Sequence, residues 1–301
     1  MNKISNLKIF ETTIYDRPME FKSFFIDYNN EFKTKNYDEK AKEIKRLKKE
    51  FLKNRITMCE KYGFDGSKII IPNDKFSKET GSYFLADEKI YSEKKDLIYV
   101  KKSKNIVLLK SDNPGIVIGY PVADDPVVII EDKDNQISAL AHCDLDKISK
   151  KVPVYMIKAL KQEANSNVKN LKVYISSNLK EKNNKYYVKP KPIKENPKVW
   201  KDSVHKYDKN DKNNIKSIIQ DLLTYRINQE HAIYNMLVKE GIDPTNITIS
   251  DRNTYEDSRL YSARKTQDYH EPNLQGKFLV GAYYEGTFPN YKEEKGRTRT
   301  L

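Results

Sequence analysis

The sequence contains too few cysteines for a disulfide framework. Only Cys59 and Cys143 occur in 301 residues, which is typical of a protein from a reducing compartment. Apolar runs are also short, since none approaches the length of a membrane-spanning helix, and residues 1–30 lack the apolar stretch of a signal peptide. We therefore expect a cytoplasmic protein without membrane contact.

The common sequence signatures of catalysis are missing as well. There is no glycine-rich phosphate loop, no paired-histidine zinc helix, no nucleophile elbow and no closely spaced cysteine pair. Among the four histidines, His205, His231 and His270 are isolated from other candidate ligands. These absences leave His142 as the best candidate for histidine chemistry, and no organic cofactor is predicted.

What the chain does contain is charge and aromatic residues. The formal net charge is +13, and 21 Tyr and 11 Phe argue against a disordered chain. The excess of positive charge favours an anionic partner. Because the lysines are spread along the chain without a recognisable nucleic-acid module, we expect nucleic acid not to be the partner. A small anionic ligand such as phosphate fits better.

Apolar periodicity predicts one mixed α/β domain over residues 1–301. Strands are expected within 7–28 and at 68–71, 97–100, 106–109, 115–119, 126–130, 137–142, 171–176, 247–249 and 278–284. Helices are expected at 38–62, with Asp38 as N-cap, at 153–163 and at 213–240. The polar stretches near 74–96 and 180–214 are expected to be irregular insertions.

One predicted hairpin brings a carboxylate and an imidazole together. Asp125 precedes its first strand and His142 ends its second, and strands of equal length place their outer ends side by side. Both groups suit zinc, whereas the other acidic residues nearby would attract a harder ion. A hydrogen-bonded His–Asp pair without metal is the alternative. Cys143 should point away from His142, because side chains alternate along a strand.

A second group of candidate residues lies in the polar loop between the last two predicted strands. The loop contains Arg252, Asn253, Arg264 and Lys265. A planar guanidinium beside an ammonium suits phosphate or carboxylate recognition. We therefore predict that these residues bind substrate, with an ordinary solvated connection as the alternative reading.

Six short motifs follow one another along the chain: ADDPVVII at 123–130, ALAH at 139–142, MLVKEG at 236–241, SDRNTYED at 250–257, LYSARK at 260–265 and QGK at 275–277. Together they resemble the laccase-domain family, also called multicopper polyphenol oxidoreductase-like or peptidoglycan-editing-factor-like. The resemblance covers about residues 97–285. It implies a single-domain, four-layer α/β/β/α fold with mixed sheets. It also implies zinc-dependent purine nucleoside phosphorolysis, adenosine deamination or, in some members, hydrolytic editing of peptidoglycan precursors.

The same resemblance assigns positions to the family's metal ligands, which are a His, a Cys and a second His. His142 matches the last ligand, Asp125 stands at the cysteine position and Lys101 falls near the first histidine position. A protonated lysine repels a cation, and one imidazole with one carboxylate is a weak zinc site. Zinc on Asp125 and His142 and a metal-free site therefore both stay open. A further family cysteine corresponds to Asn253.

Three functions follow as hypotheses. In the first, the chain is a divergent enzyme that acts on a purine nucleoside or nucleotide, with His142, Asp125 and Lys101 as catalytic candidates and Arg264 with Lys265 binding the anionic partner. In the second, it is a non-catalytic module that sequesters a nucleotide-like ligand or a protein partner. In the third, it is an amide hydrolase acting on a cell-wall precursor. The oligomeric state is not predicted.

Overall fold

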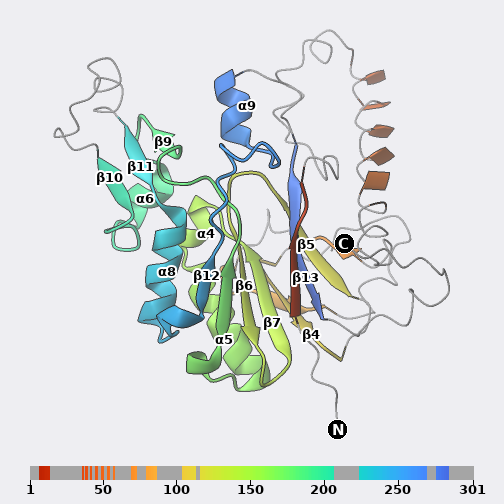
Figure 1. Cartoon of the computed structure of the whole chain (residues 1–301), viewed down its shortest axis with the longest axis vertical. Coiled ribbons are helices and arrows are strands. Elements are labelled where there is room, and N and C mark those ends of the chain that lie inside the picture. The colour runs from red at the N-terminus through yellow and green to blue at the C-terminus, as the bar shows by residue number, and fades with distance from the viewer. Residues whose placement is uncertain are drawn as a thin grey trace.

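The computed structural model describes residues 7–13, part of 36–57, 69–72, 79–86, 104–112, 116–206, 224–269 and 276–284. Within these residues the strands form three sheets (Figure 1). The six-stranded sheet has the order β12-β8-β6-β7-β4-β3, the four-stranded sheet β1-β13-β5-β2 and the three-stranded sheet β10-β11-β9. Parallel and antiparallel pairs occur in the first two of these sheets, so the mixed α/β architecture expected from the sequence is confirmed.

The bounds of the strands are β1 Leu7–Glu11, β2 Ile69–Ile70, β3 Tyr83–Leu85, β4 Ile106–Lys110, β5 Val117–Val122, β6 Val127–Asp132, β7 Ile137–His142, β8 Lys172–Ile175, β9 Lys185–Tyr186, β10 Val204–Lys206, β11 Tyr225–Ile227, β12 Ile247–Ile249 and β13 Phe278–Tyr284. The helices are α4 Leu145–Ser149, α5 Val152–Ala164, α6 Lys191–Glu195, α8 Gln229–Lys239 and α9 Ala263–Tyr269, with 3-10 turns at Val168–Asn170 and Pro244–Asn246.

Two hydrophobic cores lie on the two faces of the six-stranded sheet. One core packs the sheet against α4, α5 and α8 and contains Ala141, Cys143 and Leu160. The other core lies between the six-stranded and four-stranded sheets and contains Leu140 and Val280. In Figure 1 the helical residues of segment 38–57 lie on the side of the four-stranded sheet that faces away from α5 and α8.

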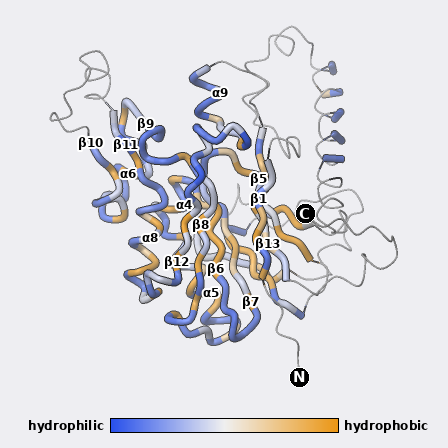
Figure 2. Tube along the Cα trace, viewed as in Figure 1, coloured by the Kyte–Doolittle hydropathy of each residue, from blue (hydrophilic) through white to orange (hydrophobic). Residues whose placement is uncertain are grey.

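The apolar residues are concentrated where the sheets pack. Figure 2 shows them on the central strands, whereas α9 is largely hydrophilic. Among the described residues, no helix combines the length and the apolar character needed to cross a membrane.

The β6–β7 hairpin forms as the sequence predicts. Val127 pairs with His142 at its open end and Asp132 with Ile137 at the turn. Gln136 adopts a positive φ of 52° in that turn, and Asn135 donates to Asp132 through both its backbone and its side chain. The hairpin therefore brings the residues just outside it, Asp125 and Cys143, to one end of the sheet.

The helix predicted at 213–240 is wrong in part of its length. Residues 225–227 are strand β11, and α8 begins only at Gln229. Ile227 is fully buried and β11 pairs with β9 and β10, so tertiary packing overrides the helical spacing of the apolar residues. Asn228 caps α8, its side chain accepting a hydrogen bond from the backbone N–H of His231. Residues 207–223 lie outside the described residues.

The two stretches expected to be irregular contain regular structure. Strand β3 falls within 74–96, and β9, α6 and β10 fall within 180–214. The second stretch is anchored by Trp200, which is buried and donates from Nε1 to Ser149 Oγ at 2.8 Å. Short strands, one short helix and one buried aromatic residue therefore lie within a segment that is polar in composition. The strand expected at 97–100 lies outside the described residues.

The first helix has a different N-cap from the one predicted. Asn36 Oδ1 accepts from the backbone N–H of Glu39 at 3.0 Å, and Glu39 Oε2 accepts from the backbone N–H of Asn36 at 3.1 Å. These reciprocal bonds are a capping box. The helix therefore begins after Asn36, and Asp38 lies inside its first turn.

Candidate functional site

Asp125 and His142 meet at the open end of the β6–β7 hairpin. His142 Nε2 lies 3.7 Å from Asp125 Oδ2, and the two side chains are 20% and 36% exposed. The predicted proximity is thus confirmed, although the distance exceeds a hydrogen bond. The pair is reachable from solvent while still partly enclosed. Cys143 is buried in the core on the helix side of the sheet, pointing away from His142 as predicted.

Lys147 contacts the other nitrogen of the same imidazole. Its Nζ lies 3.4 Å from His142 Nδ1 and 3.6 Å from Asp144 Oδ2. Asp144 is the N-cap of α4 and accepts from the backbone N–H of Lys147 at 2.8 Å. The Lys147 side chain is only 9% exposed. Sequence reasoning missed Lys147, although Asp144, three residues before it, could be recognised as an N-cap that accepts from its backbone N–H.

Gln229 holds the Asp125 carboxylate by its other oxygen. The Gln229 Nε2 donates to Asp125 Oδ1 at 3.2 Å. Gln229 is the first residue of α8 and is buried. It too was missed, because the sequence placed residue 229 in the middle of a long helix.

Asp124, next to the candidate site, connects the hairpin to the closing segment. Its Oδ1 accepts from Thr254 Oγ1 and its Oδ2 from the backbone N–H of Arg264, both at 2.8 Å. These bonds bring Arg264 to the end of the sheet where Asp125 and His142 lie. Arg264, one of the predicted substrate-binding residues, is therefore tied to this end of the sheet.

Arg264 covers the ring of Tyr186. The guanidinium carbon lies 5.0 Å from the ring centroid, and Nη1 donates to the backbone carbonyl of Lys185 at 2.9 Å. Burial raises the pKa of the Tyr186 phenol, the Arg264 charge opposes that shift, and the Asp125 carboxylate adds to it. Both charges therefore act on the phenol. Tyr186 is a third residue of the site that the sequence did not indicate.

Arg252 and Asn253 make internal contacts on the other side of the loop. Arg252 Nε donates to Asp257 Oδ2 at 2.8 Å. Asn253 donates from Nδ2 to Asn183 Oδ1 at 2.7 Å and accepts from the backbone N–H of Tyr255 at 3.1 Å. Both residues thus hold the loop in place, and the substrate-binding role predicted for them stays a prediction.

The same holds for the remaining predicted residues. Lys265 is half-buried, and its backbone N–H donates to Oγ of Ser262, the residue before α9, at 3.1 Å. Its predicted contact with an anion stays a prediction. Lys101 lies outside the described residues.

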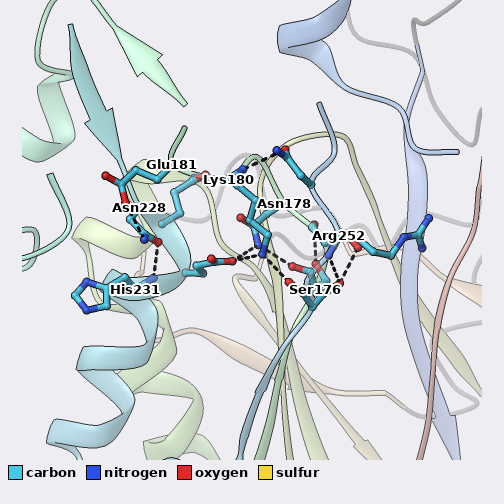
Figure 3. Close-up of polar contacts among 12 residues, drawn as sticks. Ser176, Asn178, Lys180, Glu181, Asn228, His231 and Arg252 are labelled. Atoms are coloured by element: carbon cyan, nitrogen blue, oxygen red, sulfur yellow. Dashed lines mark hydrogen bonds and ion pairs between the residues drawn. The ribbon is translucent and has the colours of Figure 1, made fainter. Parts of the chain in front are cut away.

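A second polar cluster lies where the parallel strands β8 and β12 end (Figure 3). Lys180 Nζ bonds to Glu230 on α8 and donates to the carbonyl of Ser250 at 2.5 Å. Asn178 Nδ2 donates to Glu230 Oε2 at 3.1 Å and to the carbonyl of Ser176 at 2.9 Å. These bonds fasten the start of α8 to the sheet and thereby support Gln229.

His142 and Asp125 are the residues that would hold a zinc ion. Lys147 can only donate a hydrogen bond, so a bond from its ammonium to His142 Nδ1, 3.4 Å away, would require the neutral ring to carry its proton on Nε2. Nε2 would then lack the lone pair that a metal needs, and in that tautomer the donor pair does not fit zinc. Among the described side chains, no three His, Cys, Asp or Glu residues are grouped so that they could hold a metal ion.

Comparison with known proteins gives one family. The family model described as multi-copper polyphenol oxidoreductase laccase matches residues 43–279. Among proteins with curated descriptions, none matches the sequence.

Solved structures share the fold at low sequence identity. The Bacillus licheniformis hypothetical protein YfiH is similar with a TM-score of 0.64 and 14% identity over 92% of each chain. YlmD from Geobacillus stearothermophilus gives 0.62 and 12% identity over 78% of this chain and 80% of its own. Neisseria meningitidis protein NMB0706 gives 0.59 and 11% identity over 93% and 95%. The laccase-domain-like fold expected from the sequence is confirmed.

Proposed function

Because the chain belongs to the multi-copper polyphenol oxidoreductase laccase family, we propose that it is an enzyme that acts on a purine nucleoside or nucleotide by acid–base chemistry. The observation that carries this proposal is the pairing of Asp125 and His142, 3.7 Å apart and partly exposed, at the end of a rigid hairpin. Catalytic pairs of this kind are commonly held on such scaffolds.

The two groups have different roles in this proposal. In phosphorolysis, a phosphate oxygen forms a bond to the anomeric carbon of the ribose while the bond from that carbon to the purine nitrogen breaks. The purine leaves with the electron pair and gains the proton that the phosphate loses. His142 Nε2–H would donate a hydrogen bond to the leaving purine, and the Asp125 carboxylate would hold the proton in transit.

Substrate recognition would come from the closing segment and β9. Arg264 supplies a guanidinium, which suits phosphate, and its contact with the Tyr186 ring of β9 holds it in place. Asp124 holds the backbone of Arg264 in place through a 2.8 Å hydrogen bond. Lys265, the next residue, would add a second positive charge. The formal net charge of +13 would further attract an anionic substrate.

The test is product formation from a panel of nucleosides. Purified protein is incubated with adenosine, inosine and guanosine, with and without phosphate, with added divalent metals and after chelation. Free base and deaminated nucleoside are then separated by chromatography. Free base formed only with phosphate supports phosphorolysis, and inosine formed from adenosine supports deamination. A lack of product under every condition would contradict the proposal.

A sequestering module is the second candidate, and the small number of metal-binding side chains favours it. Among the described residues no three His, Cys, Asp or Glu residues are grouped so that they could hold a metal ion, so metal-assisted catalysis has little support. Thermal melting separates the two candidates. A nucleoside that raises the melting temperature without being converted supports sequestration.

A further inference from the structure

We infer that Lys147 is a positioning residue that fixes the tautomer of His142 and thereby keeps a metal ion off the Asp125–His142 pair. The inference concerns the state of the imidazole in the resting protein. It therefore does not depend on a nucleoside being the substrate.

The first step is the placement of Lys147. It occupies the third position of α4, and its backbone N–H is held by the N-cap side chain of Asp144 at 2.8 Å. The side chain folds back toward the end of β7, where Nζ reaches His142 Nδ1 at 3.4 Å. Asp144 thus positions both ends of Lys147, through the backbone bond and through the 3.6 Å contact with its ammonium.

The second step is the burial of the charge. The Lys147 side chain is 9% exposed, and a buried ammonium is costly unless polar partners surround it. Lys150, one turn later on the same helix, keeps its side chain 53% exposed and pairs with Asp146 at 2.6 Å. A short helix does not by itself require a buried lysine, so the position of Lys147 points to a specific contact with His142.

The third step is the hydrogen-bond inventory of the ring. A neutral imidazole has one nitrogen that donates and one that accepts. An ammonium has three donors and no acceptor, so Nδ1 must accept from Lys147 and Nε2 must carry the hydrogen. Nε2–H faces the Asp125 carboxylate at 3.7 Å. A metal ion needs the nitrogen lone pair of Nε2 and would also be repelled by the ammonium.

The fourth step compares this site with a typical metal site. A metal-binding histidine usually donates its distal N–H to a carboxylate or a carbonyl, which leaves the ligating nitrogen with its lone pair. Here the Lys147 ammonium occupies the position of that outer partner. It donates a hydrogen bond to the ring, whereas the usual partner accepts one. Exchanging Lys147 for a neutral side chain should therefore turn the pair into a better metal site.

The experiment measures the tautomer and the zinc affinity of four proteins. Histidine is labelled with 15N, and two-bond proton–nitrogen correlations are recorded for the wild type, Lys147→Met, Lys147→Arg and Lys150→Met. The His142 signals are assigned by their loss in His142→Gln. Zinc is titrated into each protein by calorimetry and into the labelled samples. Lys150→Met is the matched control, because it makes the same substitution on the same helix away from His142.

We expect the Nε2–H tautomer of His142 in the wild type, in Lys147→Arg and in Lys150→Met, without a change at His142 when zinc is added. In Lys147→Met, zinc should displace the Nε2 proton and bind roughly 10-fold more tightly or better. The inference is overturned if wild-type His142 is the Nδ1–H tautomer, if zinc shifts wild-type His142, or if folded Lys147→Met gains no affinity. If Lys147→Met does not fold, the tautomer of His142 and its response to zinc in the wild type and in Lys147→Arg still test the inference.

Discussion

Arg252 and Glu11 form an ion pair that joins the polar loop after β12 to strand β1, with Nη1 3.5 Å from Oε2. The Glu11 side chain is 7% exposed and also accepts from Tyr174 Oη at 2.9 Å and from Ser177 Oγ at 2.5 Å. Tyr174 lies in β8, and Ser177 follows two residues after the end of that strand. One carboxylate therefore connects the edge of the four-stranded sheet to the six-stranded sheet and to the loop.

Exchanging Glu11 for Gln tests this connection. Glu11→Gln keeps the size of the side chain but removes the charge that balances Arg252 and replaces one acceptor oxygen with a donor. We expect the free energy of unfolding, measured by urea denaturation, to fall by about 2–4 kcal/mol. Glu256→Gln is the control, because Glu256 pairs with Lys182 at the surface, where both side chains are about half exposed, and should change stability by less than about 0.5 kcal/mol. Equal effects of the two substitutions would show that Glu11 does not connect the sheets.

The pH dependence of stability should depend on Asp257. Hydrogen bonds from Arg259 and then from Arg252 hold the pKa of the Asp257 carboxyl well below its usual range. A depressed pKa in the folded state stabilises the protein above the unfolded pKa of about 4. That contribution is lost as the pH falls from about 4 through the folded pKa.

Asp257→Asn should therefore be less stable than the wild type at pH 7, and the difference should shrink as the pH is lowered below about 4. Urea denaturation of both proteins between pH 7 and pH 2 measures the difference in their free energies of unfolding. If that difference stays constant over this range, the charge of the Asp257 carboxylate is not what makes the wild type more stable.

The positions of strands along the chain could be predicted from the sequence wherever apolar residues form a continuous run. Strands β6 and β7 are such runs, and the equal length of their hairpin arms is enough to predict that Asp125 lies beside His142. Strand β11 could not be predicted, because its three residues lie inside a longer helical pattern and become a strand only by pairing with β9 and β10. Local propensity is weak compared with such pairing.

Trp200 anchors the segment around 180–206 to the core on the helix side of the sheet. Trp200→Phe removes the donor to Ser149 Oγ and leaves space in the core on the helix side. We expect it to reduce the free energy of unfolding by about 1–3 kcal/mol. Ser149→Ala, which removes only the acceptor, should cost a similar or smaller amount. Stability unchanged in both variants would mean that this segment is not packed against the core.

Only part of the candidate site could be predicted from the sequence. Asp125 and His142 were found because one hairpin brings them together. Lys147, Gln229 and Tyr186 were not found, because they come from α4, α8 and β9 and meet the pair only through the tertiary fold. Spacing along the chain identifies residues on one element, but it cannot identify residues on separate elements.

Gln229 should affect turnover without contacting the substrate. Gln229→Leu removes the hydrogen bond to Asp125 Oδ1 and frees the carboxylate to rotate. On a nucleoside that the wild type converts, we expect kcat to fall roughly 10- to 100-fold with a smaller change in KM. Gln229→Glu would place a like charge beside Asp125 and should be at least as severe. Wild-type kcat in both variants would show that the carboxylate needs no such support.

The most direct test of the proposed acid–base chemistry is the release of free purine base from a nucleoside and phosphate by the wild type and by His142→Gln under identical conditions. We predict that the wild type forms base and that His142→Gln, with an unchanged melting temperature, forms it roughly 100- to 10,000-fold more slowly. Equal rates of base formation by the two proteins, or no base from either, would contradict a catalytic role for His142.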